Sequence, residues 1–321
     1  MRLFPADQRV GLGGGPFGNL YSEVSDEDAA AAIEAAWQEG WRYFDTAPHY
    51  GLGLSEERLG AALRDKPRDE YVLSSKVGRI LYESDQGPAP DTEGFAVTTT
   101  RRRRWDFSRD GVLRSVEDSL QRMGADRLDV VFVHDPDDHY EEAVATAFPT
   151  LVELRDQGVI GAIGSGMNQA EMLTAFVNEV DVDVIMLAGR YSVLDHQALD
   201  NVMPACQAND VQVIAVGIFN SGLLAQPRPA ADATFNYAPA PPELIAKANQ
   251  LADICEGHGV SLPAVALHFP LAHPAVAGVA VGCKTAAEVH ANAELVRADI
   301  PAEVWSDLRS AGLIRPDAPT P

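Results

Sequence analysis

The stretch Asp129–His134 (DVVFVH) is a short apolar run that ends in a side chain able to donate or accept a proton. Two earlier runs, Arg42–Asp45 (RYFD) and Tyr71–Lys76 (YVLSSK), also end in polar residues. Polar side chains at the carboxyl ends of successive strands converge at one mouth of a parallel barrel. Because a Tyr, a Lys, an acid and a His can together move a proton to or from a carbonyl group, we expect one catalytic group made of Asp45, Tyr50, Lys76 and His134.

Strand and helix patterns alternate in both directions from that stretch. Eight strands are expected, at residues 9–13, 41–45, 71–76, 128–134, 159–165, 182–187, 212–217 and 276–282. Helices are expected at 25–39, from 55 onward, and at 108–124, 141–157, 169–178, 198–208, 242–258, 262–271, 285–296 and 301–311. Ser25 and Asp28 form a helix start signal. The alternation predicts an α/β protein with a single-domain (β/α)8 TIM barrel over residues 1–321.

A doubly wound sheet is the main alternative to the barrel. Gly13–Gly18 (GGGPFG) matches the dinucleotide pattern G-x-G-x-x-G, and Asp45 ends the next strand. That fingerprint requires the glycine turn to run directly into a helix. Here the helix is expected only near Ser25, and Pro16 lies inside the motif. The other interpretation is a glycine-rich turn at a barrel mouth, where the backbone can pass close to a ligand.

Charge and composition exclude several classes of partner. The net charge of −22 argues against nucleic acid, so the run Arg101–Trp105 (RRRRW) is expected to be solvated or to meet an anionic or polar ligand. No apolar run approaches the length of a membrane span, and the first residues lack the apolar region of a secretory signal. Cys206, Cys255 and Cys283 are widely spaced and odd in number, which indicates a reducing compartment and neither a disulfide framework nor a CxxC metal site. We expect a cytoplasmic protein.

A long segment without a regular pattern, Gly78–Phe107, interrupts the alternation. Loops of this length in compact domains are usually functional or mobile. We expect it to be a substrate loop beside the mouth, with Trp105 and Phe107 as an aromatic wall. His49 and Arg79 are further candidate substrate contacts, and Arg190 and Tyr191 are weaker ones. The alternative for Trp105 and Phe107 is packing against the barrel.

Over nearly its whole length the chain resembles the aldo-keto reductases, and within them the aldose 1-dehydrogenase branch. The matching segments are Gly11–Gly15, Phe44–Gly51 (FDTAPHYG), Ser74–Lys76, Arg114–Leu120, Val131–Asp135, Ala162–Asn168, Ala188–Tyr191 and Phe219–Leu224. The resemblance implies a barrel, a nicotinamide cofactor and a catalytic tetrad at the four residues named above. Under it, Tyr50 transfers the proton, Lys76 lowers the pKa of Tyr50, Asp45 holds Lys76, and His134 bonds the substrate oxygen.

The resemblance also implies a set of cofactor contacts. They are Gly14, Ser165, Asn168, Asn220, Ser221, Gly222, Leu224, Gly282, Lys284, Thr285, Glu288 and Asn292. Ser165 and Asn168 would lie near the nicotinamide carboxamide, although the family's usual Gln and stacking Tyr are replaced near Ala188 and at Val216. The contacts within Phe219–Leu224 would lie over the pyrophosphate, and those from Gly282 to Asn292 resemble the adenosine-binding segment. A carboxylate at Glu288 would repel a 2′-phosphate, whereas Lys284 would attract one. We therefore expect NAD or NADP, with NAD favoured.

The leading hypothesis is NAD(P)-dependent oxidation of an aldose, such as L-fucose or D-arabinose, at C1 to the lactone. The partner would be a small molecule, with no nucleic acid and no membrane, and the protein a monomer or homodimer. The alternatives within the family are a pyridoxal 4-dehydrogenase and a general aldehyde reductase. An alternative of another class is a non-catalytic, cofactor-binding regulatory subunit, as the potassium-channel β subunits are in this superfamily.

Overall fold

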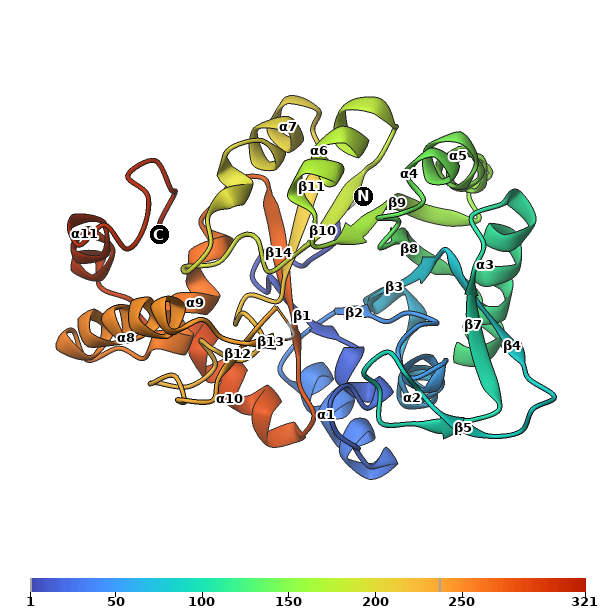
Figure 1. Cartoon of the computed structure of the whole chain (residues 1–321), viewed down its shortest axis with the longest axis horizontal. Helices are drawn as coiled ribbons and strands as arrows, with labels where there is room; N and C mark the ends of the chain where they lie inside the picture. Colours follow the sequence, from blue (N-terminus) through green and yellow to red (C-terminus); the bar gives the residue numbers. More distant parts are fainter. Residues whose placement is uncertain (1, 237) are drawn as a thin grey trace.

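Eight parallel strands close into a barrel in the computed structural model, which describes residues 2–236 and 238–321 (Figure 1). In order around the barrel they are β1 (Val10–Gly13), β2 (Tyr43–Asp45), β3 (Val72–Val77), β8 (Leu128–His134), β9 (Ile160–Met167), β10 (Val184–Ala188), β11 (Gln212–Val216) and β14 (Val276–Gly282). All eight lie where strands are expected from the sequence. The closed barrel confirms the predicted fold class and excludes the doubly wound sheet.

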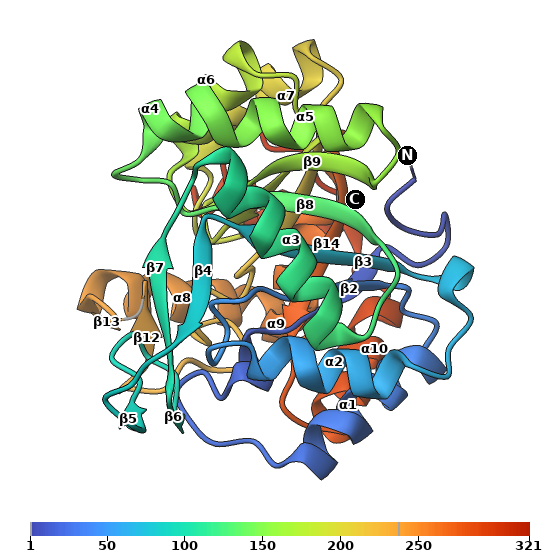
Figure 2. The same ribbon diagram turned by 90° about the vertical axis from the view of Figure 1, so that its right-hand side faces the viewer.

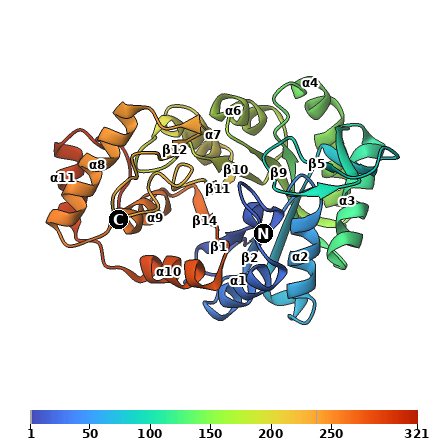
Figure 3. The same cartoon turned by 60° about the horizontal axis from the view of Figure 1, so that its bottom comes forward.

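Helices surround the barrel on its outside. They are α1 (Asp26–Gln38), α2 (Leu54–Leu63), α3 (Arg109–Met123), α4 (Tyr140–Glu142), α5 (Phe148–Asp156), α6 (Ala170–Glu179), α7 (Val202–Ala208), α8 (Pro242–Gly257), α9 (Leu262–Leu271), α10 (Ala286–Arg297) and α11 (Ala302–Ser310). Figure 3 shows α1 beside α10, and α8 with α11 on the opposite side from α2 and α3. Ser25 caps α1, since its hydroxyl accepts the Asp28 N–H, which confirms the predicted start signal.

The helix expected at 141–157 is divided. A π-helical segment, Ala143–Ala147, separates α4 from α5. Pro149 lies in the first turn of α5 and has no N–H to donate to the preceding turn, which interrupts the regular α-helical ladder.

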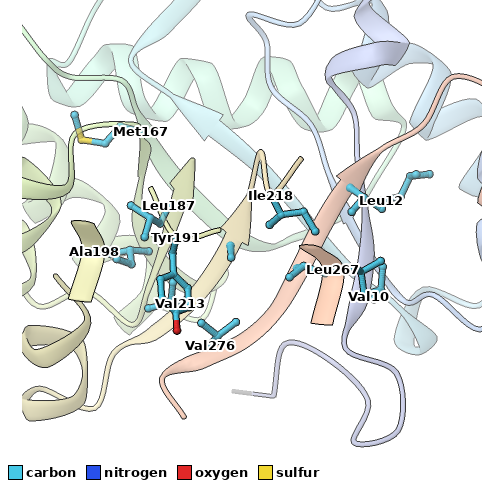
Figure 4. Packing of buried hydrophobic residues seen from close by; sticks show 14 of the residues in the cluster. Val10, Leu12, Met167, Leu187, Tyr191, Ala198, Val213, Ile218, Leu267 and Val276 are labelled. Atoms are coloured by element: carbon cyan, nitrogen blue, oxygen red, sulfur yellow. The ribbon is translucent and has the colours of Figure 1, made fainter. Parts of the chain in front are cut away.

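The period-two alternation of the strands decides which side chains enter the barrel. Val130 and Phe132 of β8 lie in the inner core with Tyr43 of β2, whereas Val131 and Val133 lie in the outer core beneath the helices. Figure 4 shows part of that outer layer, with Val10, Leu12, Leu187 and Val213 among its members. When this alternation is continued two residues at a time along each strand, Asp45, Lys76 and His134 fall on the inner side. The parity of each strand therefore turns these polar ends toward one another.

The amino-terminal segment closes the bottom of the barrel. Leu3 and Phe4 belong to the inner core, and the Phe4 ring stacks on Tyr43 with 4.8 Å between ring centroids. Arg9 donates to the backbone carbonyls of Leu271, Val276 and Ala277. With that end filled, the carboxyl ends of the strands are left as the open mouth.

Residues 78–107, here called the flap, contradict the prediction of an irregular loop. β4 (Arg79–Glu83) pairs antiparallel with β7 (Arg101–Trp105), and β5 (Ala89–Pro90) pairs with β6 (Thr98–Thr99). Figure 2 shows β4 and β7 side by side, with β5 and β6 at their far end. The sequence gives little indication of strands here because β7 consists largely of charged side chains. Partners elsewhere in the chain neutralise these charges in the folded protein.

The basic run of β7 is mostly structural. Arg103 forms an ion pair with the buried carboxylate of Asp91 and a second with Glu93 at 3.0 Å. Arg101 pairs with Glu57 on α2 at 2.6 Å. These ion pairs hold the flap together and fasten it to the barrel, so Arg101 and Arg103 are not free to bind an anion.

No helix in the described part of the chain is long and apolar enough to cross a membrane. Cys206, Cys255 and Cys283 are free thiols, and burial raises the pKa of each to about 12. They are therefore protonated and unreactive near neutral pH. The cytoplasmic location stays a prediction.

Candidate active site

A buried ion pair lies at the mouth of the barrel. Lys76 Nζ donates to Asp45 Oδ2 at 2.7 Å and to the Thr46 carbonyl at 2.9 Å. Ser74 donates to the other carboxylate oxygen, Oδ1, at 2.7 Å. Burial alone would lower the pKa of the Lys76 amine, but Asp45, with a smaller effect of Tyr50, raises it above its ordinary value. The lysine is thus a fixed positive charge.

Tyr50 lies directly over that charge. Lys76 Nζ is 4.6 Å from the centroid of the Tyr50 ring. The loop carrying Tyr50 packs against the glycine-rich turn, because Gly51 has a φ of +64° and a Cβ there would lie 2.4 Å from the Gly18 carbonyl oxygen. Gly13–Gly18 therefore has a packing role: it allows two backbones to meet and positions Tyr50.

Burial raises the pKa of Tyr50 to about 12, and Lys76 opposes that rise without overcoming it. The direction of the Lys76 effect agrees with the sequence prediction, but its size does not produce a net decrease in the protein without ligands. The phenol is consequently protonated near neutral pH and suited to donate a proton.

His134 completes the group. The centroid of its ring is 5.6 Å from that of the Tyr50 ring and 5.6 Å from that of the His49 ring, and both pairs are in edge-to-face orientation. Burial, and then the positive charges of Arg79 and Lys76, lower the pKa of His134 well below its usual range. The imidazole is therefore neutral and can donate one hydrogen bond while accepting another.

Three of the four side chains line one cavity of about 680 Å³ at the barrel mouth, whereas Asp45 lies behind Lys76 and is not among the lining residues. These three are Tyr50, Lys76 and His134. The other walls of the cavity come from the ends of β9, β10 and β11, from the β1–α1 connection and from the flap. A neutral His, a protonated Tyr and a fixed ammonium thus share one cavity, which suits proton transfer to or from a bound carbonyl or hydroxyl group.

Comparison with known proteins agrees with this geometry. Residues 9–312 match the Aldo/keto reductase family. The chain belongs to that family. As a member of it, the chain is an NAD(P)-dependent oxidoreductase that acts on a small molecule.

Individual aldo/keto reductases resemble the chain to different degrees. A D-threo-aldose 1-dehydrogenase from Pseudomonas sp is 46% identical over 316 residues, covering 97% of this chain and 95% of that protein. A pyridoxal 4-dehydrogenase from Microbacterium luteolum is 40% identical over 323 residues, covering 95% and 94%. The solved glycerol dehydrogenase from Gluconobacter oxydans superposes with a TM-score of 0.76 at 23% identity, covering 98% of this chain and 93% of that one. This last similarity concerns the fold.

The nicotinamide contacts expected from the aldo/keto reductase family divide into two groups. Asn168, Ala188 and Val216 line the cavity. Ser165 does not, because it lies on the outer parity of β9 and donates to the Val133 carbonyl at 3.0 Å. Asn220, expected near the pyrophosphate, already has a partner for each polar atom of its side-chain amide: Oδ1 accepts from Ser192 at 2.6 Å and Nδ2 donates to the Gly189 carbonyl at 3.2 Å.

The remaining contacts near the pyrophosphate and the glycine turn have local partners. The Gly14 N–H donates to the Asp45 carbonyl at 2.7 Å, and the buried Leu224 donates its N–H to the Phe219 carbonyl at 3.0 Å. Ser221 and Gly222 have left-handed backbones, with φ of 58° and 93°. None of these four residues is among those lining the cavity, and their contact with a cofactor stays a prediction.

The predicted adenosine segment lies at the start of α10. Thr285 caps the helix by accepting the Glu288 N–H, and the Glu288 carboxylate accepts the Lys284 N–H at 2.7 Å, just after Gly282. The Lys284 ammonium donates to Ser22 at 2.8 Å. Asn292 Oδ1 is buried and has no hydrogen-bond partner within the described residues. An unpaired buried acceptor is what a ligand amino group would satisfy, so these residues fit an adenosine group.

The expected substrate residues lie in different places. His49 lines the cavity, and burial, aided by Arg79, Arg103 and Lys76, lowers its pKa to about 2. Arg79 is directed at His134 and Asp135. Trp105 stacks on the buried Phe107 at 5.6 Å, and neither is among the residues lining the cavity.

The weaker candidates lie further away. Tyr191 is in the outer core, beside Phe269, with ring centroids 5.3 Å apart. Arg190 donates to Asn236 at 2.9 Å.

Several residues that line the cavity are not predicted from the sequence. They are Glu93 and Phe95 from the flap, Asp135 and Asp137 after β8, and Met186 on β10. The flap tip reaches the mouth because the Tyr21 N–H donates to the Gly94 carbonyl at 3.1 Å and the Ala96 N–H donates to the Asn19 carbonyl at 2.9 Å. Parity would have identified Met186, whereas only the folded flap identifies Glu93 and Phe95.

Proposed function

We propose that the chain oxidises an aldose at C1 to the lactone, with NAD as the favoured coenzyme. The observation that carries this proposal is the polar wall of the cavity. Carboxylates of Glu93, Asp135 and Asp137 line the same cavity as Tyr50 and His134. Carboxylates accept hydrogen bonds from hydroxyl groups, and a sugar offers several. The 46% identical D-threo-aldose 1-dehydrogenase supports the same substrate class.

The residues divide the work of removing two hydrogens from C1 and its hydroxyl group. His134 donates to the substrate oxygen and holds C1 in place. Tyr50 accepts the hydroxyl proton as the C–O single bond becomes a carbonyl. Lys76, kept in place by Asp45, stabilises the phenolate form of Tyr50. A bound nicotinamide supplies the acceptor for the hydride.

A pyridoxal 4-dehydrogenase is the second candidate, favoured by the 40% identical relative and by the aromatic Phe95 in the cavity wall. Initial rates with L-fucose, D-arabinose, L-galactose, pyridoxal and simple aldehydes, each with NAD and NADP, separate the candidates. The highest kcat/KM is expected with a sugar. Preference for pyridoxal would replace the aldose proposal, and activity on simple aldehydes alone would indicate a general reductase.

The rate of oxidation is expected to increase with pH. Tyr50 accepts a proton only as phenolate, and its pKa is about 12 in the protein without ligands. Below that pKa the phenolate fraction rises about tenfold per pH unit. A cationic nicotinamide nearby would lower the pKa and bring the plateau to lower pH. Profiles of kcat for oxidation and reduction between about pH 7 and 10 test this, since reduction should stay nearly constant while oxidation rises.

Glu288→Gln is expected to weaken the preference for NAD. The variant keeps an oxygen to accept the Lys284 N–H but removes a charge close to where a 2′-phosphate would lie. A charge interaction of about 1 kcal/mol in water corresponds to roughly fivefold in the ratio of kcat/KM for NAD and NADP. Glu294→Gln, on the exposed side of the same helix, is the control. An unchanged ratio would remove Glu288 from coenzyme selection.

A further inference from the structure

Arg79 contacts His134 from behind the cavity. Its Nη1 lies 3.4 Å from His134 Nδ1, and Nη1 and Nη2 each lie 3.2 Å from Asp135 Oδ2. A guanidinium group has only donors. His134 Nδ1 must therefore accept in this contact, and in the neutral imidazole the ring proton is then on Nε2.

The flap holds Arg79 in this position. Arg79 and Trp105 are direct cross-strand partners in the β4–β7 ladder, and the guanidinium carbon is 4.1 Å from the centroid of the Trp105 ring. Gly78 has a φ of +109°, and a Cβ there would lie 2.4 Å from the Phe107 ring. The Asp106 N–H also donates to the Gly78 carbonyl at 2.9 Å. Trp105 and Phe107 thus restrain Arg79 although they do not line the cavity.

We propose that Arg79 is a positioning residue that keeps His134 in the tautomer with the proton on Nε2. The kinetic part of this proposal rests on the proposed function, because it assigns the Nε2 proton to the substrate oxygen. The groups around the imidazole are Tyr50, Lys76, His49, Arg79 and Asp135. Asp135 is the carboxylate nearest to Nε2, at 3.4 Å, and Arg79 binds that carboxylate as well.

The arrangement explains why a charged residue is buried here. Arg79 is 9% exposed, and burying a cation is costly unless it has partners. Asp135 supplies the charge partner, and its backbone has a left-handed φ of 42°. Without Arg79, His134 Nδ1 loses its donor and only Asp135 near Nε2 still favours the productive tautomer, which is then populated less.

Nitrogen NMR of protein labelled with [15N]histidine tests the proposal without any substrate. The His134 signals, assigned by their loss in His134→Asn, are expected to show a pyridine-like Nδ1 and a pyrrole-like Nε2. Arg79→Met is expected to give a mixture or the opposite tautomer, and Arg79→Lys, which keeps a donor, to restore part of the original pattern. A proton on Nδ1 in the unaltered protein would overturn the proposal, whether or not the variants fold.

Kinetics provide the second arm. Arg79→Met is expected to lower kcat about 10- to 100-fold with the KM for coenzyme unchanged. Arg104→Met is the matched control, since it removes the same charge from an exposed position on β7. Unaltered kcat together with an unaltered tautomer in Arg79→Met would show that Arg79 has only a structural role. If no aldose is oxidised but the NMR result holds, the substrate proposal fails and the tautomer proposal stands.

Discussion

Tyr50→Phe is expected to lower kcat about 10²- to 10⁴-fold, the range typical for loss of a general acid or base. The phenol is the only hydroxyl group among the tetrad side chains, and it lies over the Lys76 ammonium with 4.6 Å between the nitrogen and the ring centroid. Removing one oxygen leaves the ring to pack as before. The thermal midpoint and the Kd for coenzyme are therefore expected to stay unchanged, and stopped-flow measurement of the hydride step isolates the chemical effect.

Tyr191→Phe is the matched control for this variant. Tyr191 is also buried, and its hydroxyl has no hydrogen-bond partner within the described residues. Its removal should change neither activity nor stability by a measurable amount. A near-normal kcat in Tyr50→Phe would contradict the assignment of Tyr50 as the residue that transfers the proton. A fall in kcat for Tyr191→Phe would instead indicate a general effect of losing a buried phenol hydroxyl.

Lys76→Met is expected to reduce both activity and stability. The lysine is paired at 2.7 Å with a carboxylate that is buried like itself. Breaking a buried ion pair from one side costs about 3–5 kcal/mol, because the other charge remains without a partner. Activity should fall at least about 10²-fold, since Tyr50 loses the charge that favours its phenolate.

The double variant Asp45→Asn/Lys76→Met separates the two effects. With no unpaired charge left behind, most of the lost stability should return in urea unfolding, whereas activity should stay low. The opposite result, in which the double variant regains activity, would assign the pair a purely structural role. Equal stability of Lys76→Met and the unaltered protein would contradict the buried pair itself.

Much of the candidate site could be predicted because strand parity is a local property. Asp45, Lys76 and His134 each end an apolar run on its inner parity, and the barrel then brings them together. The same rule, applied to β9, would have turned Ser165 toward the helices, where it bonds the Val133 carbonyl. The prediction that Ser165 contacts the nicotinamide depended on family resemblance alone. It disagrees with the parity of β9, in which Ala162 is inner and Ile163 is outer.

The flap was not predictable in this way. Its strands are held by partners distant in the sequence, such as Arg101 with Glu57 and the bridge between Leu20 and Phe95. Trp105 was expected to contact substrate, but in the folded flap it lies against Arg79. No local pattern distinguishes an aromatic side chain that faces a cavity from one that supports a neighbouring guanidinium.

The sequence by itself determined the barrel, the outward-facing helices and the convergence of an acid, a Lys and a His at the strand ends. These follow from hydrophobic periodicity and from the short distance between each strand and the residue that ends it. Only the tertiary structure decided the protonation of the site and the walls of the cavity. Burial outweighs the effect of Lys76 on the pKa of Tyr50, and Arg79 reaches His134 across 55 residues of chain. Burial and contact between distant segments exist only once the chain has folded.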